Sequence, residues 1–321
     1  MRLRMYAAVA ALAASTGAAA AAAYPVKPVR LVTTFAPGGG ADVVARAIGS
    51  KLQESWGHAL VIDNRAGAGG IVGTEIVARA APDGYTLLMG SAAGLFLNGL
   101  LGVRLPYDAF RDLAPISLLV INPQLLTATA SIQVSSVKEL IAHLKARPGA
   151  INYASVGQGS TSHLGMELFK SMTGTNAVHV AYKGSAPALN ALIAGEVQVM
   201  FSNMPGVLPH ARAGRVKALG VGGTRRATAA PDLPTIAESG VPGFQNVAWF
   251  GLFAPARVPK DIIATLNAAI VNALADPAVV QRLIAGGAEP AAGTPEALRA
   301  YMGQEFERWK GVVQAAKLQA Q

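Results

Sequence analysis

Hydrophobic positions near the start of the chain change their spacing over a short distance, from a mostly apolar, strand-like run to a repeat of four residues. The run covers residues 29–35, and after a glycine-rich turn at residues 36–42 the repeat continues at Val44, Ile48 and Leu52. This order predicts a buried strand, a turn and an amphipathic helix. The turn would lie at a helix N-terminus, where peptide dipoles and unpaired backbone NH groups favour a negatively charged ligand.

The same pattern occurs again near the middle of the chain. Residues 151–155 form the apolar run, residues 156–162 form a turn of glycine and hydroxyl residues, and a helix follows with Leu164, Leu168 and Met172. Two such turns, far apart in a chain of two-domain length, predict two lobes that close on one small anionic ligand.

Strand-like and helix-like segments alternate along the rest of the chain, which predicts β-α-β units and a largely parallel sheet. We expect further strands at 59–63, 85–89, 177–182, 197–201 and 249–254, a loop at 202–206, and helices at 185–194, at 260–275 and from 294 onward. A helix after residue 70 should bury Val72, Ile76 and Ala80, because apolar residues repeat there at intervals of four.

Two apolar segments are candidates for the connections between the lobes. Residues 116–127 form a long, nearly continuous apolar run, and residues 216–221 form a strand that leads back. Two crossings make the first domain discontinuous, so we expect lobe 1 to contain residues 24–121 and 222–321, and lobe 2 residues 122–221. The expected architecture is two α/β lobes joined by a two-strand hinge.

The first 23 residues have the composition of a secretory signal peptide. Arg2 and Arg4 form a charged start, an alanine-rich run follows, and residues 21–23 are small. We expect cleavage near Ala23 and export of the mature protein; a retained anchor is the alternative, but alanine promotes membrane insertion only weakly. The chain contains no cysteine, so it has no thiol for lipid attachment or for a disulfide.

Charge and motif content exclude several classes of function. The formal net charge is +9, but the basic residues are scattered, whereas a nucleic-acid surface needs clustered charge and aromatic platforms. The motif GxxxxGK[ST] does not occur, and Gly67, Gly69 and Gly73 miss the dinucleotide spacing by one residue. The five histidines show no metal-binding spacing. We therefore expect no cofactor, no metal and no nucleic-acid partner.

Three residues at the turns leave alternatives open. His163 follows a serine-rich turn, so a catalytic serine and histidine pair is conceivable, but Glu167 has the spacing of a helix partner rather than of a ring-orienting acid. We favour a histidine that contacts ligand or backbone. Asp42 fits a ligand contact or, more often at such a position, a helix cap or dipole partner. Lys183, next to Tyr182 at a strand end, fits a ligand contact or a solvated side chain.

Seven stretches of the chain, taken together and in order, resemble the Bug (TctC-like) family of substrate-binding proteins of tripartite tricarboxylate transporters. They are residues 35–42, 64–70, 81–85, 153–163, 181–184, 233–240 and 249–255. The resemblance covers essentially the whole chain after the signal peptide. It implies a type II periplasmic binding protein fold with a two-strand hinge, and a periplasmic receptor that holds a carboxylate between its lobes.

The resemblance also implies which residues line the ligand site. In this family, backbone amides, hydroxyls and ordered water hold much of the ligand carboxylate. The implied contacts are Phe35, Ala36, Pro37, Gly38, Gly39, Asn64, Ser91, Gly157, Gly159, Ser160, Thr161, His163, Tyr182 and Ser202, and Asp42 and Lys183 are further candidates. Many members carry an aspartate, which can meet a ligand amino group, at the position of Ser202. Its absence favours a plain organic acid over an amino acid.

These features predict a binding protein rather than an enzyme. Its expected role is to deliver a small mono- or dicarboxylate to the membrane subunits of a tripartite tricarboxylate transporter. Two alternatives stay open: a loaded receptor that signals to a membrane sensor, and a periplasmic enzyme that acts on a carboxylic acid with His163 as its base. We expect a monomer, since nothing in the sequence demands more.

Overall fold

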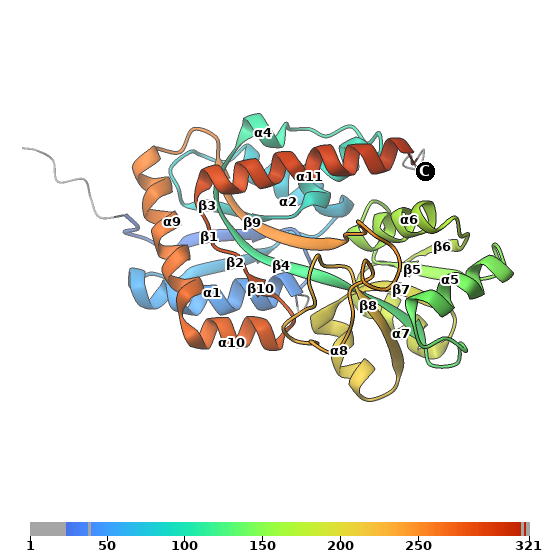
Figure 1. The fold of residues 1–321 in the computed structure, drawn as a ribbon. Coiled ribbons are helices and arrows are strands. Elements are labelled where there is room, and N and C mark those ends of the chain that lie inside the picture. Colours follow the sequence, from blue (N-terminus) through green and yellow to red (C-terminus); the bar gives the residue numbers. More distant parts are fainter. Residues whose placement is uncertain (1–23, 38–39, 316–317, 319–321) are drawn as a thin grey trace, which may run out of the picture.

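The computed structural model describes residues 24–37, 40–315 and 318, and places them in two α/β lobes (Figure 1). The expected signal peptide, residues 1–23, and the turn residues Gly38 and Gly39 lie outside this described part. One sheet of ten strands runs through both lobes in the order β2-β1-β3-β9-β4-β7-β5-β6, with β8 and β10 paired to β4. Strand β4 therefore lies at the centre of a shared sheet.

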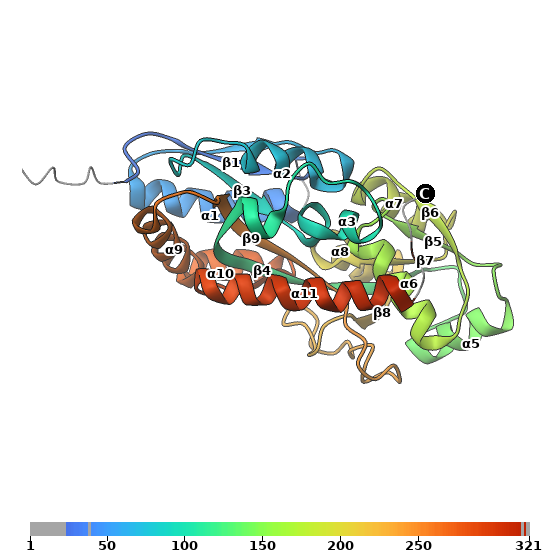
Figure 2. The same ribbon diagram turned by 90° about the horizontal axis from the view of Figure 1, so that it is seen from above.

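The first lobe has three layers, because helices cover both faces of its part of the sheet (Figure 2). Its strands are β1 (Val29–Thr33), β2 (Leu60–Asn64), β3 (Thr86–Gly90), β9 (Val247–Pro255), β10 (Glu289–Pro290) and the first half of β4 (Leu113–Thr129). One face packs against α1 (Gly40–Trp56), α9 (Lys260–Ala275) and α10 (Pro277–Ala285). The other packs against α2 (Ile71–Ala78), α4 (Ala109–Asp112), α11 (Pro295–Ala315) and the short helices η1 (Ala68–Gly70), η2 (Ala93–Leu97) and α3 (Asn98–Leu100).

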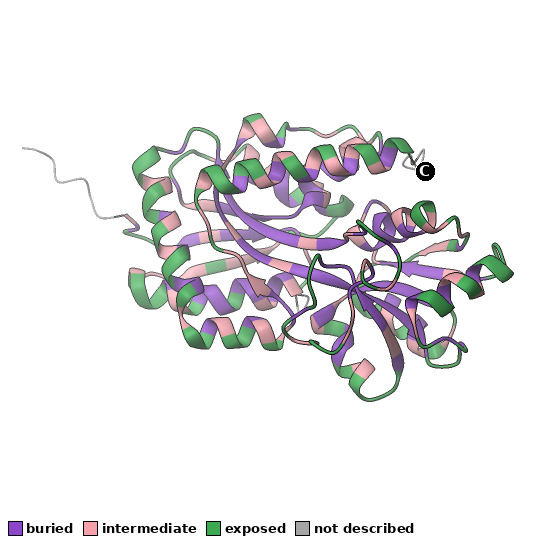
Figure 3. Ribbon diagram, in the orientation of Figure 1, coloured by how far each residue is buried: buried purple, intermediate pink, exposed green. Residues whose placement is uncertain are grey.

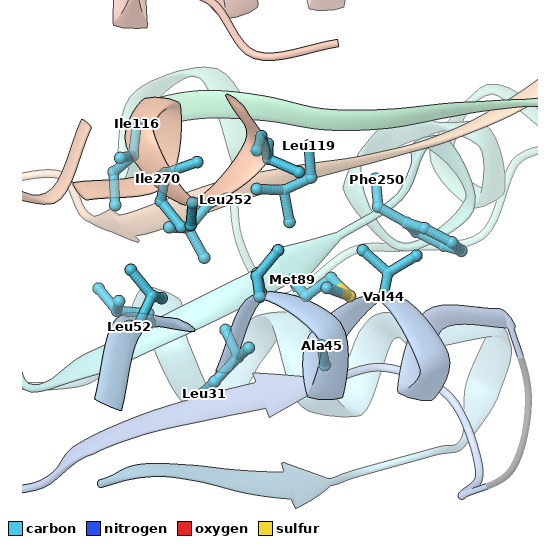
Figure 4. Packing of buried hydrophobic residues seen from close by; sticks show 14 of the residues in the cluster. Leu31, Val44, Ala45, Leu52, Met89, Ile116, Leu119, Phe250, Leu252 and Ile270 are labelled. Atoms are coloured by element: carbon cyan, nitrogen blue, oxygen red, sulfur yellow. The ribbon is translucent and has the colours of Figure 1, made fainter. Parts of the chain in front are cut away.

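The core of the first lobe confirms the helical repeat read from the sequence. Val44, Ile48 and Leu52 of α1 are 1%, 0% and 2% exposed. They belong to one buried cluster with Leu31 of β1 and Met89 of β3 (Figure 4). Burial of each such aliphatic side chain stabilises the fold by about 1.5–3 kcal/mol. This packing holds the N-terminus of α1 close to the carboxyl end of β1.

The second lobe has the same layered construction. Strands β5 (Asn152–Ser155), β6 (Val178–Ala181), β7 (Val199–Asn203) and β8 (Val216–Val221) join the second half of β4, and the helices are α5 (Val137–Ala146), α6 (Thr161–Thr173), α7 (Ser185–Ala194) and α8 (Met204–Arg212). Strand β5 pairs in parallel with β6 and β7, so their carboxyl ends share one edge. Ligands of parallel sheets bind at such edges, and the second glycine turn follows β5 there.

Strand β4 carries the chain from the first lobe into the second. It pairs with β9 from Leu113 to Pro123 and with β7 from Gln124 to Ala128, and most of its length is buried (Figure 3). The second connection differs from the predicted one. Strand β8 pairs with β4 within the sheet of the second lobe, and the chain returns through β9, whose Val247 pairs with Pro123. The hinge has two strands, but β9 takes the place that the sequence suggested for β8.

The segment between β8 and β9, residues 222–246, packs against the second lobe. Its side chains Ile236, Val241 and Phe244 belong to a buried cluster of that lobe. The lobe boundaries expected from the sequence stay a proposal, and this packing favours a second boundary near Val247.

Three local expectations are corrected. Helix α2 turns a different face inward, because Val72 is 43% exposed whereas Gly73 and Thr74 are buried. Residues 202–206, expected as a loop, contain the end of β7 and the start of α8. Helix α10 was not expected between the two C-terminal helices; Asp276 caps it with a side-chain oxygen.

Candidate ligand-binding site

The side chain of Asn64, at the end of β2, contacts the end of β1 and the start of α1. Strands β2, β1 and β3 are parallel neighbours, so their carboxyl ends share one edge of the sheet. Asn64 Nδ2 donates to Thr33 Oγ1 at 2.8 Å and to the Phe35 carbonyl at 3.0 Å, and it lies 3.5 Å from Asp42 Oδ1. Asn64 thereby ties the end of β1 to the first turn of α1 and fixes both ends of the first glycine turn.

Asp42 lies in the first turn of α1 and is 5% exposed. Its carboxylate forms an ion pair with Arg46, whose Nε lies 2.8 Å from Oδ2 one helical turn later. A carboxylate at this position also interacts favourably with the helix dipole. The structure therefore shows Asp42 as a helix partner, and a direct ligand contact stays a proposal.

Two buried hydroxyl groups at this edge have no hydrogen-bond partner among the described residues. They are Thr34 Oγ1, directly after β1, and Ser91 Oγ, directly after β3, in residues that are 3% and 7% exposed. Gly70 and Gly94 allow their two backbone segments to lie close together here, because a Cβ at Gly70 would lie 3.1 Å from Gly94 Cα. A buried unpaired polar group costs about 1–3 kcal/mol. These hydroxyls would therefore gain most from an added hydrogen-bond acceptor.

The second-lobe turn is held mainly by its own side chains. Ser160 caps α6, because its Oγ accepts from His163 N at 3.3 Å and donates to the Gly157 carbonyl at 2.6 Å. Gly159 N donates to His163 Nδ1 at 3.2 Å, and Ser162 Oγ accepts from the first NH of the turn at 3.0 Å. The expectation that this turn leaves its NH groups unpaired is wrong for these amides. The turn instead has a fixed shape.

Three stacked rings lie behind this turn. His179 of β6 lies between Tyr153 of β5 and His163 of α6, with ring centroids 4.9 Å and 4.1 Å away and interplanar angles of 20° and 15°. The stack follows from the sheet register, which pairs Tyr153 with His179. His179 Nε2 lies 2.6 Å from Ser155 Oγ, and that oxygen accepts from Gly157 N at 3.2 Å.

Burial keeps both imidazoles of the stack neutral. Burial, and after it the electrostatic influence of the His179 ring, lower the pKa of His163 to about 4, whereas Glu167 raises it and Lys170 lowers it. Burial also lowers the pKa of His179. The Glu167 carboxylate is itself engaged by Tyr153 Oη and by Lys170 Nζ, the latter at 2.7 Å. Because His163 Nδ1 accepts a backbone NH, the ring proton lies on Nε2.

The two lobes touch at the tip of the second turn. A Cβ at Gly159 would lie 2.9 Å from Asn98 Oδ1 and 3.0 Å from Leu101 Cδ1, both in the first lobe. Asn98 Nδ2 donates in turn to the Gly69 carbonyl at 3.3 Å. Leu164, in the first turn of α6, is 0% exposed and belongs to a buried cluster of the first lobe. The second turn therefore faces the edge at which the strands of the first lobe end.

The remaining candidates lie around the turns with different exposure. Tyr182 is half-buried, and its NH donates to the Ser155 carbonyl at 3.0 Å, which places it beside the second turn. Ser202 is 3% exposed, with its hydroxyl 3.3 Å from Thr127 Oγ1. The exposed candidates are Ala36, Pro37 and Lys183, and the half-buried ones are Phe35 and Thr161.

Sequence reasoning missed three residues that lie at the turns. Thr34 was placed inside a longer strand, so its hydroxyl was not considered. Asn98 is a single amide in an uncharged, glycine-rich segment, and that isolation was the available signal. His179 is linked to the second turn through the pairing of β5 with β6, which the sequence does not contain in any local pattern.

Three further observations concern metal binding, membrane crossing and hollows on the surface. Among the described residues, no group of three His, Cys, Asp or Glu side chains lies close enough to hold a metal ion. Within the same part of the chain, no single helix has the length and hydropathy to cross a bilayer; α9 and α10 reach them only as a pair bent by 71°. Two surface hollows meet at Arg111 of α4, and neither includes a residue of the two turns.

Comparison with known sequences identifies relatives along nearly the whole chain. A sequence profile described as "Tripartite tricarboxylate transporter family receptor" matches residues 44–318. The chain is 41% identical over 291 residues to Protein BugT of Bordetella pertussis, and this alignment covers 90% of the chain and 89% of BugT.

Two solved structures with the same fold are 37% and 35% identical to this chain. One is described as R. palustris Rpa4515 with adipate; it has a TM-score of 0.87 and 37% identity, and the match covers 92% of this chain and 99% of that one. MatC (Rpa3494) from Rhodopseudomonas palustris, described with bound malate, has a TM-score of 0.83 and 35% identity over 90% of this chain and 100% of its own. These matches confirm the expected two-lobed α/β architecture.

Proposed function

The chain belongs to the family of tripartite tricarboxylate transporter receptors, and on this premise we propose that it binds a small organic acid between its two lobes. Membership makes it a solute-binding receptor with the type II periplasmic binding fold. The descriptions of two related structures name adipate and malate, which supports a carboxylate as the ligand. Ser202, in place of an aspartate, favours the same class of ligand.

The observation that carries the proposal is the position of the second turn against the strand ends of the first lobe. Gly159 packs against Asn98, while Thr34 and Ser91 offer buried hydroxyls without partners, within the described residues, at the same edge. A carboxylate presents several acceptor positions to such donors. Hydrogen bonds to a charged acceptor contribute about 1.5–3 kcal/mol each, so about three to five would support micromolar binding after the cost of closure.

We assign the ligand contacts to the two turns and to the residues beside them. From the first lobe they are Thr34, Phe35, Ala36, Pro37, Gly38, Gly39, Asn64 and Ser91, and from the second Gly157, Gly159, Ser160, Thr161, Tyr182 and Ser202. Asp42, which lies 3.5 Å from Asn64 Nδ2, is a further candidate contact, and His163 supports the second turn by accepting from Gly159 N. Lys183, which is exposed, adds positive charge at the rim of the site.

Delivery to the membrane subunits of a tripartite tricarboxylate transporter is the role we propose for the loaded receptor. The signal peptide, cleaved near Ala23, would place the mature monomer in the periplasm. Ligand contacts made only in the closed state would raise the closed population, which presents a surface that the empty receptor lacks. A loaded receptor that signals to a membrane sensor is the alternative. Loss of uptake of the radiolabelled acid after gene deletion would support transport; unchanged uptake would support signalling.

An enzyme with His163 as its base is disfavoured by the hydrogen bonds of the second turn. Nδ1 of His163 accepts from Gly159 N, so Nε2 carries the proton and offers no lone pair to a substrate. Ser160 Oγ donates to the Gly157 carbonyl rather than to the ring. Mass spectrometry of the acids after incubation with purified protein should show no conversion. Conversion of any of the acids would support the enzymatic alternative.

The decisive experiment is a thermal-shift screen of the mature protein against mono-, di- and tricarboxylates that include adipate and malate. A ligand at 100 times its Kd stabilises the folded state by about 2.7 kcal/mol, which raises Tm by several degrees. At least one acid should produce this shift. A flat response to the whole panel would contradict carboxylate binding.

A double variant then tests the second turn. Ser160→Ala with Thr161→Ala should weaken calorimetric binding of the identified acid by at least about tenfold. Ser160 also caps α6, so its loss lowers stability by about 1 kcal/mol irrespective of ligand. Ser136→Ala is the matched control, because Ser136 caps α5 in the same way by accepting from Glu139 N. If both variants change the affinity equally, the hydroxyls of the second turn do not contact the ligand.

A further inference from the structure

The rings of His163 and His179 contact the second turn from behind, through Gly159 and Ser155. We propose that His163 is a positioning residue: its unprotonated Nδ1, kept in place by stacking on His179, holds the Gly159 amide and with it the ligand-binding shape of the second turn. This inference rests on the proposed ligand site, but its first test requires no ligand.

Gly159 belongs to the second turn and lies against the first lobe, so a small displacement of this residue would change contacts in both lobes. Its backbone φ is 71°, a conformation that favours glycine, and a Cβ there would lie 2.9 Å from Asn98 Oδ1. Its NH donates to His163 Nδ1 at 3.2 Å. A side chain of α6 therefore sets the orientation of a peptide that lies against the first lobe at the tip of the turn. Misorientation by as little as an ångström displaces donors from a bound ligand.

His163 can do this only as a neutral imidazole with its proton on Nε2. The ionisable groups that face it come from all the elements packed around it: His179 of β6, Tyr153 of β5, and Glu167 and Lys170 of α6 itself. Glu167 raises the pKa of His163, but its carboxylate also accepts from Tyr153 Oη and Lys170 Nζ, and the effect of burial is larger. Burial, together with His179, lowers the pKa of His163 to about 4. The ring is therefore neutral at neutral pH.

A proton on Nδ1 would convert the acceptor into a donor. Two NH groups would then face each other across the 3.2 Å that now separates Gly159 N from His163 Nδ1, and the turn would have to rearrange. Since the pKa of His163 is depressed, the bond is present at neutral pH and is lost as the pH falls toward about 4.

Two substitutions separate hydrogen bonding from packing. His163→Phe keeps a ring that can stack on His179 but has no acceptor. His163→Asn loses the stack but keeps an acceptor, because Oδ1 of asparagine lies as many bonds from Cβ as Nδ1 of histidine. Amide hydrogen exchange at Gly159, followed by NMR and corrected for the intrinsic rate, reads the bond in the ligand-free protein.

We expect the Gly159 amide to be protected at neutral pH in the wild type and in His163→Asn, and to exchange at least about tenfold faster in His163→Phe. Near pH 4 the wild type should lose this protection, whereas His163→Asn should retain it. The affinity for adipate or malate should fall about tenfold in His163→Phe and stay within about threefold in His163→Asn. The ratio of affinities at each pH cancels the titration of the acid itself.

The opposite ranking, with His163→Phe like the wild type and His163→Asn impaired, would show that the ring only packs and would overturn the proposal. If no acid of the carboxylate panel binds, the proposed function fails, but the exchange data still decide the role of His163. If both variants fail to fold, ¹⁵N NMR of the wild-type imidazoles decides it. A proton on Nδ1 of His163 at neutral pH would refute the assignment, and a proton on Nε2 would support it.

Discussion

The buried hydroxyl of Thr34 should lower the stability of the ligand-free protein and strengthen its binding of the organic acid. Thr34 Oγ1 has no hydrogen-bond partner within the described residues. Thr34→Val replaces it with a methyl group of similar size, so the ligand-free protein should keep its free energy of unfolding or gain about 1 kcal/mol. The affinity for the organic acid should fall about tenfold, because a charge-assisted hydrogen bond is lost. Urea unfolding and calorimetry measure the two effects.

Thr74 supplies the matched control for this prediction. It is 0% exposed, close to the 3% of Thr34, but its hydroxyl donates to the Gly70 carbonyl at 2.9 Å. Thr74→Val should therefore lower the free energy of unfolding by about 1–2 kcal/mol and change the affinity little. If both valine variants lose the same stability, the Thr34 hydroxyl is satisfied in solution and the prediction is wrong.

His163 should make the folded protein sensitive to acid. Its pKa is lowered to about 4 in the folded state, mainly by burial, while an unfolded chain has the ordinary value of about 6.5. A depressed pKa contributes no penalty above pH 6.5, and stability is lost as the pH falls from there toward 4, by on the order of 3 kcal/mol. Urea unfolding at several pH values should show a smaller loss for His163→Asn. An equal slope for both proteins would contradict the assignment.

Among the helices and strands, those with a clear repeat and a clear stop were predicted well, and those packed through small residues were not. Helix α7 has the expected bounds, since Gly195 ends it in the left-handed conformation. Helix α2 lies on the sheet through Gly73, where a Cβ would be 3.0 Å from Thr34 Cγ2. Such close packing excludes large apolar residues from the buried face of α2. The apolar repeat beginning at Val72 therefore indicated the wrong face of this helix.

Contacts between elements set the limit of what the sequence alone could give. The apolar pattern of β8 is that of a buried strand, but it does not say which half of β4 it pairs with. The ring stack has the same origin, because Tyr153 and His179 become neighbours only through the β5 and β6 register. The glycine turns could be found because strand, turn and helix are adjacent in the chain. Their alignment across two lobes depends on β4 and β9, which no local pattern specifies.

Helix α6 should be sensitive to any side chain at Gly165. A Cβ there would lie 1.8 Å from Asn246 Nδ2, and Asn246 is 0% exposed with both amide atoms lacking partners in the described part of the chain. Gly165→Ala should therefore lower the free energy of unfolding by about 1–3 kcal/mol, as overpacking does. Asn246→Ala removes unpaired polar atoms and should have a small effect.

The double variant decides whether this contact is the cause. Gly165→Ala with Asn246→Ala should be nearly as stable as Asn246→Ala alone, because the obstructing amide is gone. Urea unfolding of the four proteins gives the coupling energy. Additive losses would mean that alanine at position 165 acts through something other than Asn246.

In the whole molecule, the N-terminus of α6 is one of the places at which the two lobes touch. The second turn reaches Asn98 of the first lobe, and Leu164 joins a buried cluster that also contains Trp249 and Trp309. The C-terminal half of α11 approaches α6 in both ribbon views (Figures 1 and 2). A side chain of one lobe is thus buried in the core of the other, so separation of the lobes would expose apolar surface at this point.

The burial of Leu164 in the first lobe should therefore stabilise the closed state. Leu164→Ala removes buried contacts to the first lobe and should lower the closed population, so that affinity for the organic acid falls by about tenfold or more while the saturated complex keeps its compact shape. Small-angle X-ray scattering with and without ligand measures the compaction. Leu168→Ala on the same helix is the control, because Leu168 packs against the core of the second lobe and should lower stability without changing closure. If both variants close at the same ligand concentration as the wild type, Leu164 is an ordinary core residue and its contact with the first lobe does not govern closure.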